Sequence, residues 1–465
     1  MSDSSPTQLC FPPIGGQTVR ADFEGGALSS DFGALLLRGV DRQIGLTARL
    51  ATAIHDKRHQ SYIDHPLRDL LAQRIYQMAA GYADGNDANS LRHDPAFKLG
   101  LDRRPLDPAH DLASAPTLSR LEHQVDRKDL YRLTTSLVDH FIASYPEPPV
   151  AIVLDLDHSD DPTYGQQEFT FYNHHYQNHC YLPLFIFEGT SQALVMATLR
   201  PGIRPTGTEN AMVLIRLLSY LRRHWPQTHI LVRGDSHFAT PEVLDVITSY
   251  RWTDFIFGLA GNAVLLRQGA TTIEAAHHLH HQRVAMARAH GQTPPHSTRL
   301  YDEFSYAAGS WAHPWRVVLK AEVMSAGDNP RFVVTSLDAP TPQMVYEDLY
   351  CARGQCENAI KAVKVDLRSD RTSATTFLAN ALRLLLACAA YMLHHALRTS
   401  TLHHTALAQA QPSTIIMTLF KIAVQIKQYK DRVLLHLPSS CPVKALLQRV
   451  TTLLYVVPLP VGNTS

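Results

Sequence analysis

The stretch AIVLDLD (residues 151–157) decides the fold, because it is the first run of the chain with the two-residue period of a β-strand. Successive strand side chains point to opposite faces, so Leu154 and Leu156 share one face while Asp155 and Asp157 share the other. Such a strand buries its leucines and presents two carboxyl groups at its C-terminal end. Since α/β domains place their sites at strand ends, we expect chemistry here.

The sequence downstream first predicts more strands and then alternates helices with strands. We expect strands near 169–173, 181–187, 192–199, 229–234 and 254–259, and helices at 209–224 and from Pro241 onward, with Thr240 as N-cap. This order is typical of an RNase H-like α/β domain, a mixed sheet flanked by helices. A doubly wound dinucleotide fold is disfavoured, because no GxGxxG follows the first strand.

The flanking regions carry other patterns. Apolar residues recur three and four positions apart between about 28 and 145, which predicts helices, and a proline-rich segment at 146–149 ends the pattern. Residues 376–398 are apolar on most sides and predict a buried helix. The expected domains are 1–147 (helical, N-terminal), 148–261 (first part of the core), 262–340 (a β-rich insertion), 341–400 (second part of the core, with a Glu-bearing helix) and 401–465 (a basic, helical C-terminal region).

Charge is balanced overall but uneven along the chain. The 465 residues carry a formal charge of +1, which excludes both a histone-like basic protein and an acidic disordered tail. Beyond Ile360, however, twelve Lys and Arg residues face only three Asp residues. The positive charge of this C-terminal part could serve to bind a polyanion. An ordinary solvent-exposed helical face explains the same charge equally well.

Six scattered cysteines without a CxxC pair predict no disulfide framework, which favours a reducing cytoplasm. The N-terminus lacks the basic start and apolar run of a signal peptide. The longest strictly apolar run, 384–393, is too short to span a bilayer, so we expect no membrane association.

Carboxyl groups end two of the predicted strands. Asp155 and Asp157 end the first, and Asp235 ends HILVRGD. If these strands are neighbours, the carboxylates converge and need a shared proton or a divalent cation, for which hard oxygen ligands favour Mg²⁺ or Mn²⁺. Taken singly, an Asp at a strand end more often caps a turn.

A later helix supplies a third acid. Tyr350, Arg353, Glu357 and Lys364 lie at offsets 0, 3, 7 and 14, which in a regular α-helix falls within an arc of about 60°. An acid flanked by two cations and a phenol suits a metal ligand beside phosphate-binding groups. The alternative is an exposed helix with ordinary ion pairs.

With these residues in place, the chain resembles the DDE-type transposases of bacterial insertion sequences, in the subgroup with a Y-x2-R-x3-E-x6-K signature. All four signature positions are filled within YCARGQCENAIKAVK (350–364). The resemblance extends to LDLDHSDDPTYGQQE around the first Asp and VRGDSHFATPEVL around the second, and covers most of residues 20–400.

This resemblance implies an RNase H-like core with two Mg²⁺ or Mn²⁺ ions. The site residues that it implies are Asp157, Asp235 and Glu357 as catalytic groups and metal ligands, and Tyr350, Arg353 and Lys364 as DNA-binding groups. The implied activity is cut-and-paste transposition: cleavage at terminal inverted repeats, often through a hairpin, and strand transfer into double-stranded target DNA. It also implies that the helical domain 1–147 binds the DNA ends, and that the protein acts as a homodimer on DNA, at the nucleoid of a bacterial cytoplasm.

Several alternatives stay open. Asp155 shares the strand face with Asp157, which we prefer because Ser159 follows it at the spacing typical of the family. The protein could instead be a nuclease that never joins ends, or a transposase-derived DNA-binding protein without activity. Zinc at the histidine clusters 174–179 and 277–281, and a serine nucleophile at Ser236, are disfavoured by the absence of their usual motifs. Trp311 and Trp315 could stack on a flipped base, but core packing is favoured.

Overall fold

The computed structural model describes residues 8–325 and 327–455, and the chain divides into two compact units. The helical unit comprises residues 1–133, 362–371 and 385–465, and the sheet unit comprises residues 134–361 and 372–384. Both units are assembled from segments far apart in the sequence.

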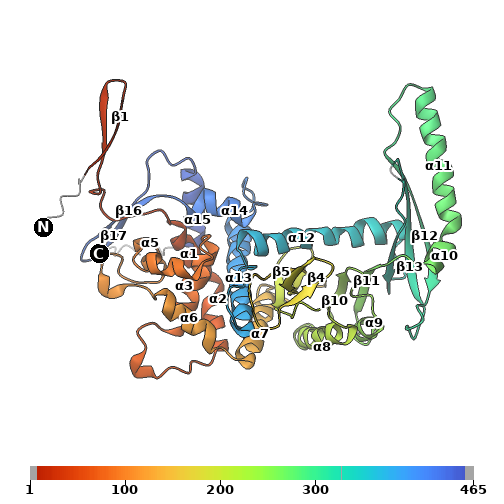
Figure 1. Cartoon of the computed structure of the whole chain (residues 1–465), viewed down its shortest axis with the longest axis horizontal. Helices are drawn as coiled ribbons and strands as arrows, with labels where there is room; N and C mark the ends of the chain where they lie inside the picture. Colours follow the sequence, from red (N-terminus) through yellow and green to blue (C-terminus); the bar gives the residue numbers. More distant parts are fainter. Residues whose placement is uncertain (1–7, 326, 456–465) are drawn as a thin grey trace, which may run out of the picture. The chain divides into compact units, whose positions relative to one another are not determined.

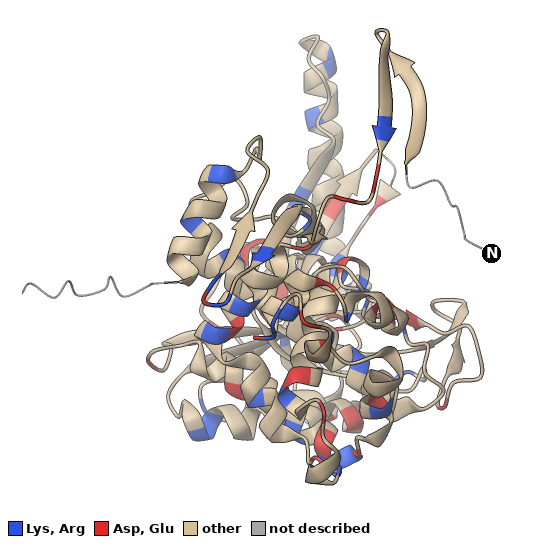
Figure 2. Ribbon diagram, turned by 90° about the vertical axis from the view of Figure 1, so that its left-hand side faces the viewer, with Lys and Arg blue, Asp and Glu red and all other residues tan. Residues whose placement is uncertain are grey.

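Helices dominate the helical unit, as the apolar periodicity predicts. Leu36, Leu37 and Val40 of the first helix are fully buried, at the three- and four-residue spacings of one helical face. Lys and Arg (blue) and Asp and Glu (red) are both scattered along the ribbon, in keeping with the balanced composition (Figure 2). The helices up to residue 143 are α1 (Gly33–Ile44), α2 (Leu46–Ala53), α3 (Leu67–Ala79), α4 (Ala88–Leu91), α5 (Pro95–Gly100), α6 (Ala115–Gln124) and α7 (Arg127–Ala143).

Two parts of this unit differ from the helical expectation. Strands β1 (Leu9–Ile14) and β2 (Gln17–Ala21) form an antiparallel hairpin around Gly15 and Gly16, both at positive φ (Figure 1). The C-terminal region, expected to be helical, contains β16 (Val424–Gln428) and β17 (Val433–His436), and β16 pairs with β17 on one side and with β3 (Leu28–Ser29) on the other.

The helical prediction was wrong for residues 424–436, because the local period there is two. Val424 and Ile426 are buried while Lys427 is exposed, the alternation of a strand. The helical segments of this region are α14 (Pro412–Ile415), the π-helical turn Ile416–Phe420 and α15 (Lys444–Leu454).

A nine-stranded mixed sheet forms the sheet unit, with main order β12-β13-β15-β11-β10-β4-β8-β9 and β14 beside β13. Strand β4 is parallel to β10, which is parallel to β11, whereas β8 runs antiparallel to β4 and β9 to β8. Strands β4, β10 and β11 lie side by side in Figure 1. The bounds of these five strands are β4 Ala151–His158, β8 Leu184–Glu188, β9 Leu194–Thr198, β10 His229–Gly234 and β11 Thr253–Leu259.

The strands and helices expected at 181–259 are confirmed to within a few residues. Helix α8 (Gly207–His224) begins with a capping box between Thr206 and Glu209, and α9 (Pro241–Thr248) has Thr240 as N-cap and Pro241 in its first turn. Near 169–173, only Phe171–Asn173 (β6) is a strand, and it joins a separate small sheet with β5 (Asp161–Pro162) and β7 (Asn178–Tyr181).

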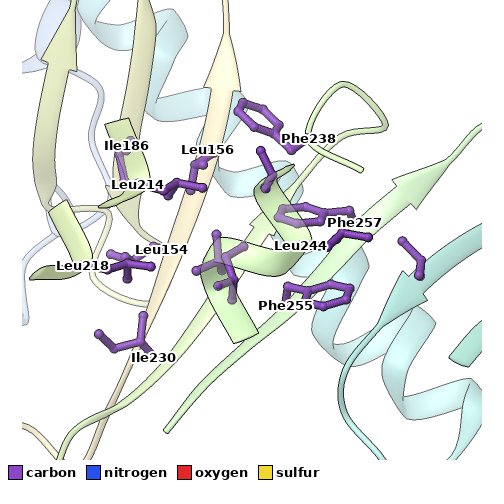
Figure 3. Packing of buried hydrophobic residues seen from close by; sticks show 14 of the residues in the cluster. Leu154, Leu156, Ile186, Leu214, Leu218, Ile230, Phe238, Leu244, Phe255 and Phe257 are labelled. Atoms are coloured by element: carbon purple, nitrogen blue, oxygen red, sulfur yellow. The ribbon is translucent and has the colours of Figure 1, made fainter. Parts of the chain in front are cut away.

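Strand alternation sends side chains into two cores. Leu154 and Leu156 of β4 pack in one cluster with Leu214 and Leu218 of α8 (Figure 3). Ile256 of β11 faces the other side, where it packs with residues that include Val345 and Tyr346. Asp155 and Asp157 alternate with the leucines and therefore point away from α8.

The insertion extends the main sheet instead of forming its own. After α10 (Ala263–Gln268) and α11 (Ala270–Ala289), strand β15 (Arg331–Thr335) pairs antiparallel with β11. Strands β13 (Trp315–Met324) and β12 (Ser297–Tyr306) continue outward from it, and the short β14 (Gly327–Asp328) pairs with β13. The expected mixture of helix and strands in 262–340 is therefore present.

One helix is long and apolar enough to cross a membrane by composition alone. It begins with α13 (Phe377–Leu397), and 83% of its apolar window is buried inside the protein. A membrane-spanning helix would expose that surface to lipid, so the burial agrees with the expected core helix.

Candidate active site

The two strand-end carboxylates are brought to one edge of the sheet. Strands β4 and β10 are parallel neighbours, with Leu154 opposite Val232 and Asp155 opposite Arg233. This register places Asp157, near the end of β4, beside Asp235, the first residue after β10. The adjacency that the sequence could only assume is thus confirmed.

Asp155 and Asp157 have different environments although they share a strand face. Asp155 is fully buried and forms a two-pronged ion pair with Arg233, whose Nε and Nη2 lie 2.6 and 2.7 Å from the two carboxylate oxygens. Arg233 also donates to the carbonyl of Leu349. Asp155 is therefore a structural group whose lone pairs are engaged, and Asp157 is the carboxylate that faces the site.

Glu357 reaches the site on a segment whose winding changes along its length. Residues Met344–Tyr350 form a π-helix, Cys351–Arg353 a 3₁₀ turn, Gly354–Lys361 the α-helix α12, and Ala362–Asp366 another π-helical turn. The calculated arc assumed a uniform α-helix and does not apply over the whole segment. π-Helical turns are frequent at functional sites.

Arg353 links two of the three acids. Its Nη1 donates to Asp157 Oδ2 at 3.0 Å, and its Nη2 lies 3.4 Å from Glu357 Oε1. The Asp157 side chain is 16% exposed and that of Glu357 is 65% exposed. Asp235 accepts from the backbone N–H of His237 at 2.9 Å, which orients it in its turn.

The carboxyl group of Asp157 has a pKa raised to about 6. Burial is the largest cause, the negative charges of Asp235 and Glu357 add to the shift, and Arg353 opposes it. Tyr350 belongs to the same cluster: burial raises its pKa, Arg353 opposes that shift, and Asp235 adds to it.

The acids fit divalent cations by their chemistry. Three carboxylates are hard oxygen ligands, and a cation bound beside Asp157 would offset the cost of burying its charge. Among residues 8–325 and 327–455, no three His, Cys, Asp or Glu side chains are grouped closely enough to hold one ion. Arg353 supplies the positive charge between Asp157 and Glu357 in this arrangement.

The two remaining signature residues, Tyr350 and Lys364, belong to different units of the chain. The Tyr350 hydroxyl lies against the backbone of β11, where a Cβ on Gly258 would approach it to 2.6 Å. Lys364 lies in the π-helical turn Ala362–Asp366 and belongs to the helical unit. The structure thus gathers Asp157, Asp235, Glu357, Tyr350 and Arg353 in one unit.

Sequence reasoning missed Arg233 and the glycine opposite it. A Cβ on Gly189 would lie 2.5 Å from Arg233 Nη2 and 2.7 Å from Asp155 Oδ2, so only glycine leaves room for the pair. One signal was available, because an arginine inside the apolar strand HILVRG needs a buried anion.

The tryptophans of the insertion and a histidine of the second cluster contact other side chains of the protein. Trp315 packs edge-on against Phe255 at 5.2 Å between ring centroids, and Trp311 packs against Tyr306 at 5.6 Å. These contacts confirm core packing for the tryptophans. In the second histidine cluster, His277 Nε2 pairs with Asp328 at 2.8 Å.

Comparison with known proteins gives a family match. A family model described as "Transposase DDE domain group 1" matches residues 11–458. No curated protein matches the chain. Among solved structures, the cryo-EM structure of the piggyBac transposase synaptic complex with hairpin DNA aligns over 94% of this chain and 84% of that chain, at 12% identity and a TM-score of 0.37.

Proposed function

Because the chain belongs to the DDE transposase family, domain group 1, it is a transposase, and we propose that it cleaves DNA at terminal inverted repeats and joins the ends to target DNA in a cut-and-paste reaction. The observation that carries the proposal is that Arg353 contacts both Asp157 and Glu357, while Asp235 lies beside Asp157 at the end of the neighbouring strand. A protein that only binds DNA has no use for such a cluster of carboxylates.

We infer that β9, β8, β4, β10 and β11 form an RNase H-like core. The parallel pairing of β4 with β10 and the antiparallel pairing of β8 with β4 support this inference. The insertion at 262–340 continues the sheet beyond β11, on the side away from β4.

In this proposal, Asp157, Asp235 and Glu357 would hold two Mg²⁺ or Mn²⁺ ions. Bound there, such ions activate a water or 3′-hydroxyl and stabilise the leaving oxygen of a phosphodiester. The side chains of this chain do the rest. Arg353 moves from the carboxylates to a DNA phosphate, for which its planar fork is suited, and Tyr350 and Lys364 bind neighbouring phosphates.

The proposal extends to the assembly and its setting. Two transposon ends must be held together, so we propose a homodimer on double-stranded DNA. We place the protein at the nucleoid of a bacterial cytoplasm, in line with scattered cysteines that form no disulfide among the described residues.

The test uses purified protein and a duplex that carries the DNA flanking its gene, in Mg²⁺ and in EDTA, with strands resolved on a denaturing gel. We expect Mg²⁺-dependent cuts at the element boundary that disappear in Asp157→Asn, Asp235→Asn and Glu357→Gln, while Glu357→Gln still binds the duplex. Asp245→Asn, an exposed acid on α9, is the matched control and should cut normally. Cleavage by Glu357→Gln would overturn the assignment.

A further inference from the structure

The helical unit contains a cavity that the proposed catalytic site does not use. Its volume is about 530 Å³, a size suited to a single nucleotide. Arg58 lies just before the 3₁₀ turn Gln60–Tyr62, Arg92 follows α4, and Arg120 lies on α6. All three arginines line the cavity, with Asp64 as the one carboxylate of the lining.

Two of these arginines have no anionic partner. Arg58 is occupied by Asp56, at 2.7 and 2.8 Å, and by the carbonyl of His65 at 2.9 Å. No described residue forms an ion pair with Arg92 or Arg120, and the Nε of Arg92 is buried without a hydrogen-bond partner. The guanidinium groups of Arg92 and Arg120 are therefore not neutralised by a carboxylate of the described chain, and they line the cavity as groups suited to an anion.

Three arginines against one carboxylate give the cavity lining an excess of positive charge, and aromatic rings border the cavity. Burial, the largest cause, and the charges of Arg103 and Arg92 lower the pKa of His65, and the charges of Asp64 and Asp69 oppose that shift. Tyr62 is 85% exposed, and its ring lies 5.5 Å from that of His59. An exposed aromatic side chain beside guanidinium groups is the combination that stacks on a base while the cations hold its phosphate.

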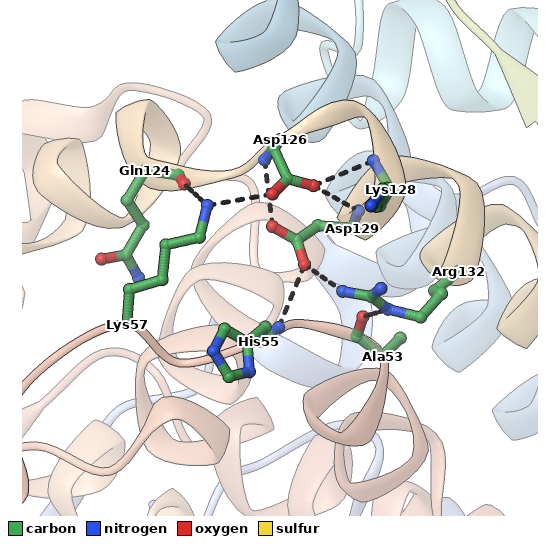
Figure 4. A network of polar contacts seen from close by, with 8 residues as sticks. All are labelled: Ala53, His55, Lys57, Gln124, Asp126, Lys128, Asp129 and Arg132. Atoms are coloured by element: carbon green, nitrogen blue, oxygen red, sulfur yellow. Dashed lines mark hydrogen bonds and ion pairs between the residues drawn. The ribbon is translucent and has the colours of Figure 1, made fainter.

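The wall of the cavity is held in place before any ligand binds. Lys57 reaches the carbonyl of Gln124 at 3.3 Å and Asp126 at 3.0 Å, while Asp129 accepts from the backbone N–H of His55 and from Arg132 (Figure 4). These bonds tie the segment preceding Arg58 to the end of α6 and the start of α7. A pre-ordered pocket loses less entropy when its ligand binds.

We propose that this cavity binds an unpaired nucleotide of DNA, its phosphate held by Arg92 and Arg120 and its base stacked on Tyr62. The inference rests on the proposed function and deepens it, because it assigns a second DNA contact in the other unit. A duplex cannot enter a cavity of this size, which leaves a single-stranded or flipped nucleotide as the occupant.

The experiment measures binding of the full chain in EDTA by fluorescence anisotropy. Two labelled probes are compared: a blunt duplex and the same duplex with a thymidine overhang. We expect Arg92→Gln and Arg120→Gln to weaken overhang binding and to lower its salt slope by about 0.7 each, the value for one single-strand phosphate. Tyr62→Ala should weaken it roughly five- to hundredfold, and Tyr62→Phe should restore it.

The controls separate this inference from the proposed function. Arg104→Gln, an exposed arginine of the same unit, should leave both probes unaffected. If the wild type binds neither probe, the proposed function fails. If it binds and the Arg92 and Arg120 variants keep its affinity and salt slope, only the cavity assignment is overturned.

Two further outcomes would also overturn the assignment. Equal weakening of blunt and overhang probes would mean that these arginines contact duplex backbone. Displacement of the overhang by thymidine monophosphate as effectively as by unlabelled overhang DNA would make the cavity a site for free nucleotides. Inorganic phosphate alone should compete only weakly, because it lacks the base that stacks on Tyr62.

Discussion

Replacing Arg233 with Met would test whether the buried ion pair beneath the carboxylates holds the site together. Arg233 makes two short bonds to Asp155 and one to the carbonyl of Leu349, which directly precedes Tyr350. It therefore connects β4, β10 and the segment that carries Arg353 and Glu357. Methionine keeps the apolar stem and removes all three bonds.

The expected loss follows from burial. Asp155 is fully buried, so Arg233→Met leaves an uncompensated carboxylate in the interior, which costs about 3–5 kcal/mol of unfolding free energy. At 2–4 °C per kcal/mol for a unit of this size, the melting midpoint should fall by roughly 6–20 °C. The double variant Arg233→Met/Asp155→Leu removes the orphaned charge and should recover much of this loss.

Thermal unfolding followed by circular dichroism measures these differences. Arg251→Met, an exposed arginine of the same unit, is the control and should change stability by less than about 0.5 kcal/mol. A double variant as unstable as Arg233→Met alone would refute the reasoning, because the loss would then not arise from an unpaired carboxylate. A single variant as stable as the wild type would show that the pair contributes nothing.

Three further predictions follow from the site. The pKa of Asp157 is raised from 3.8 to about 6, so the wild type loses stability as pH rises between these values. At pH 7.5 in EDTA, Asp157→Asn should therefore have an unfolding free energy about 3 kcal/mol higher than that of the wild type, and this difference should vanish below pH 4. A gap that is independent of pH would contradict this. Gly258→Ala should lower the melting midpoint because its Cβ meets the Tyr350 hydroxyl, and adding Tyr350→Phe should restore it; no rescue would place the clash elsewhere. Mn²⁺ added to metal-free protein should raise the melting midpoint of the wild type more than that of Glu357→Gln, and equal shifts would remove Glu357 from the ligand set.

The periodicity and spacing of residues along the chain were sufficient to predict most strands of the core and the candidate site residues. The alternation in AIVLDLD and HILVRG predicts the strands, because a side chain's face depends only on its position in the strand. The spacing of Arg353 and Glu357 likewise predicts their contact, since residues four apart on a helix are neighbours.

The sequence by itself determined which segments are strands, which residues share a face, and that two acids stand at strand ends. Only the tertiary structure decided that Asp155 pairs with Arg233 while Asp157 faces the site, since that depends on the register between β4 and β10. It alone also decided that the insertion extends the main sheet and that β16 pairs with β3 at the other end of the chain. The physical reason is that strand pairing joins residues distant in sequence, whereas periodicity reports only on neighbours along the chain.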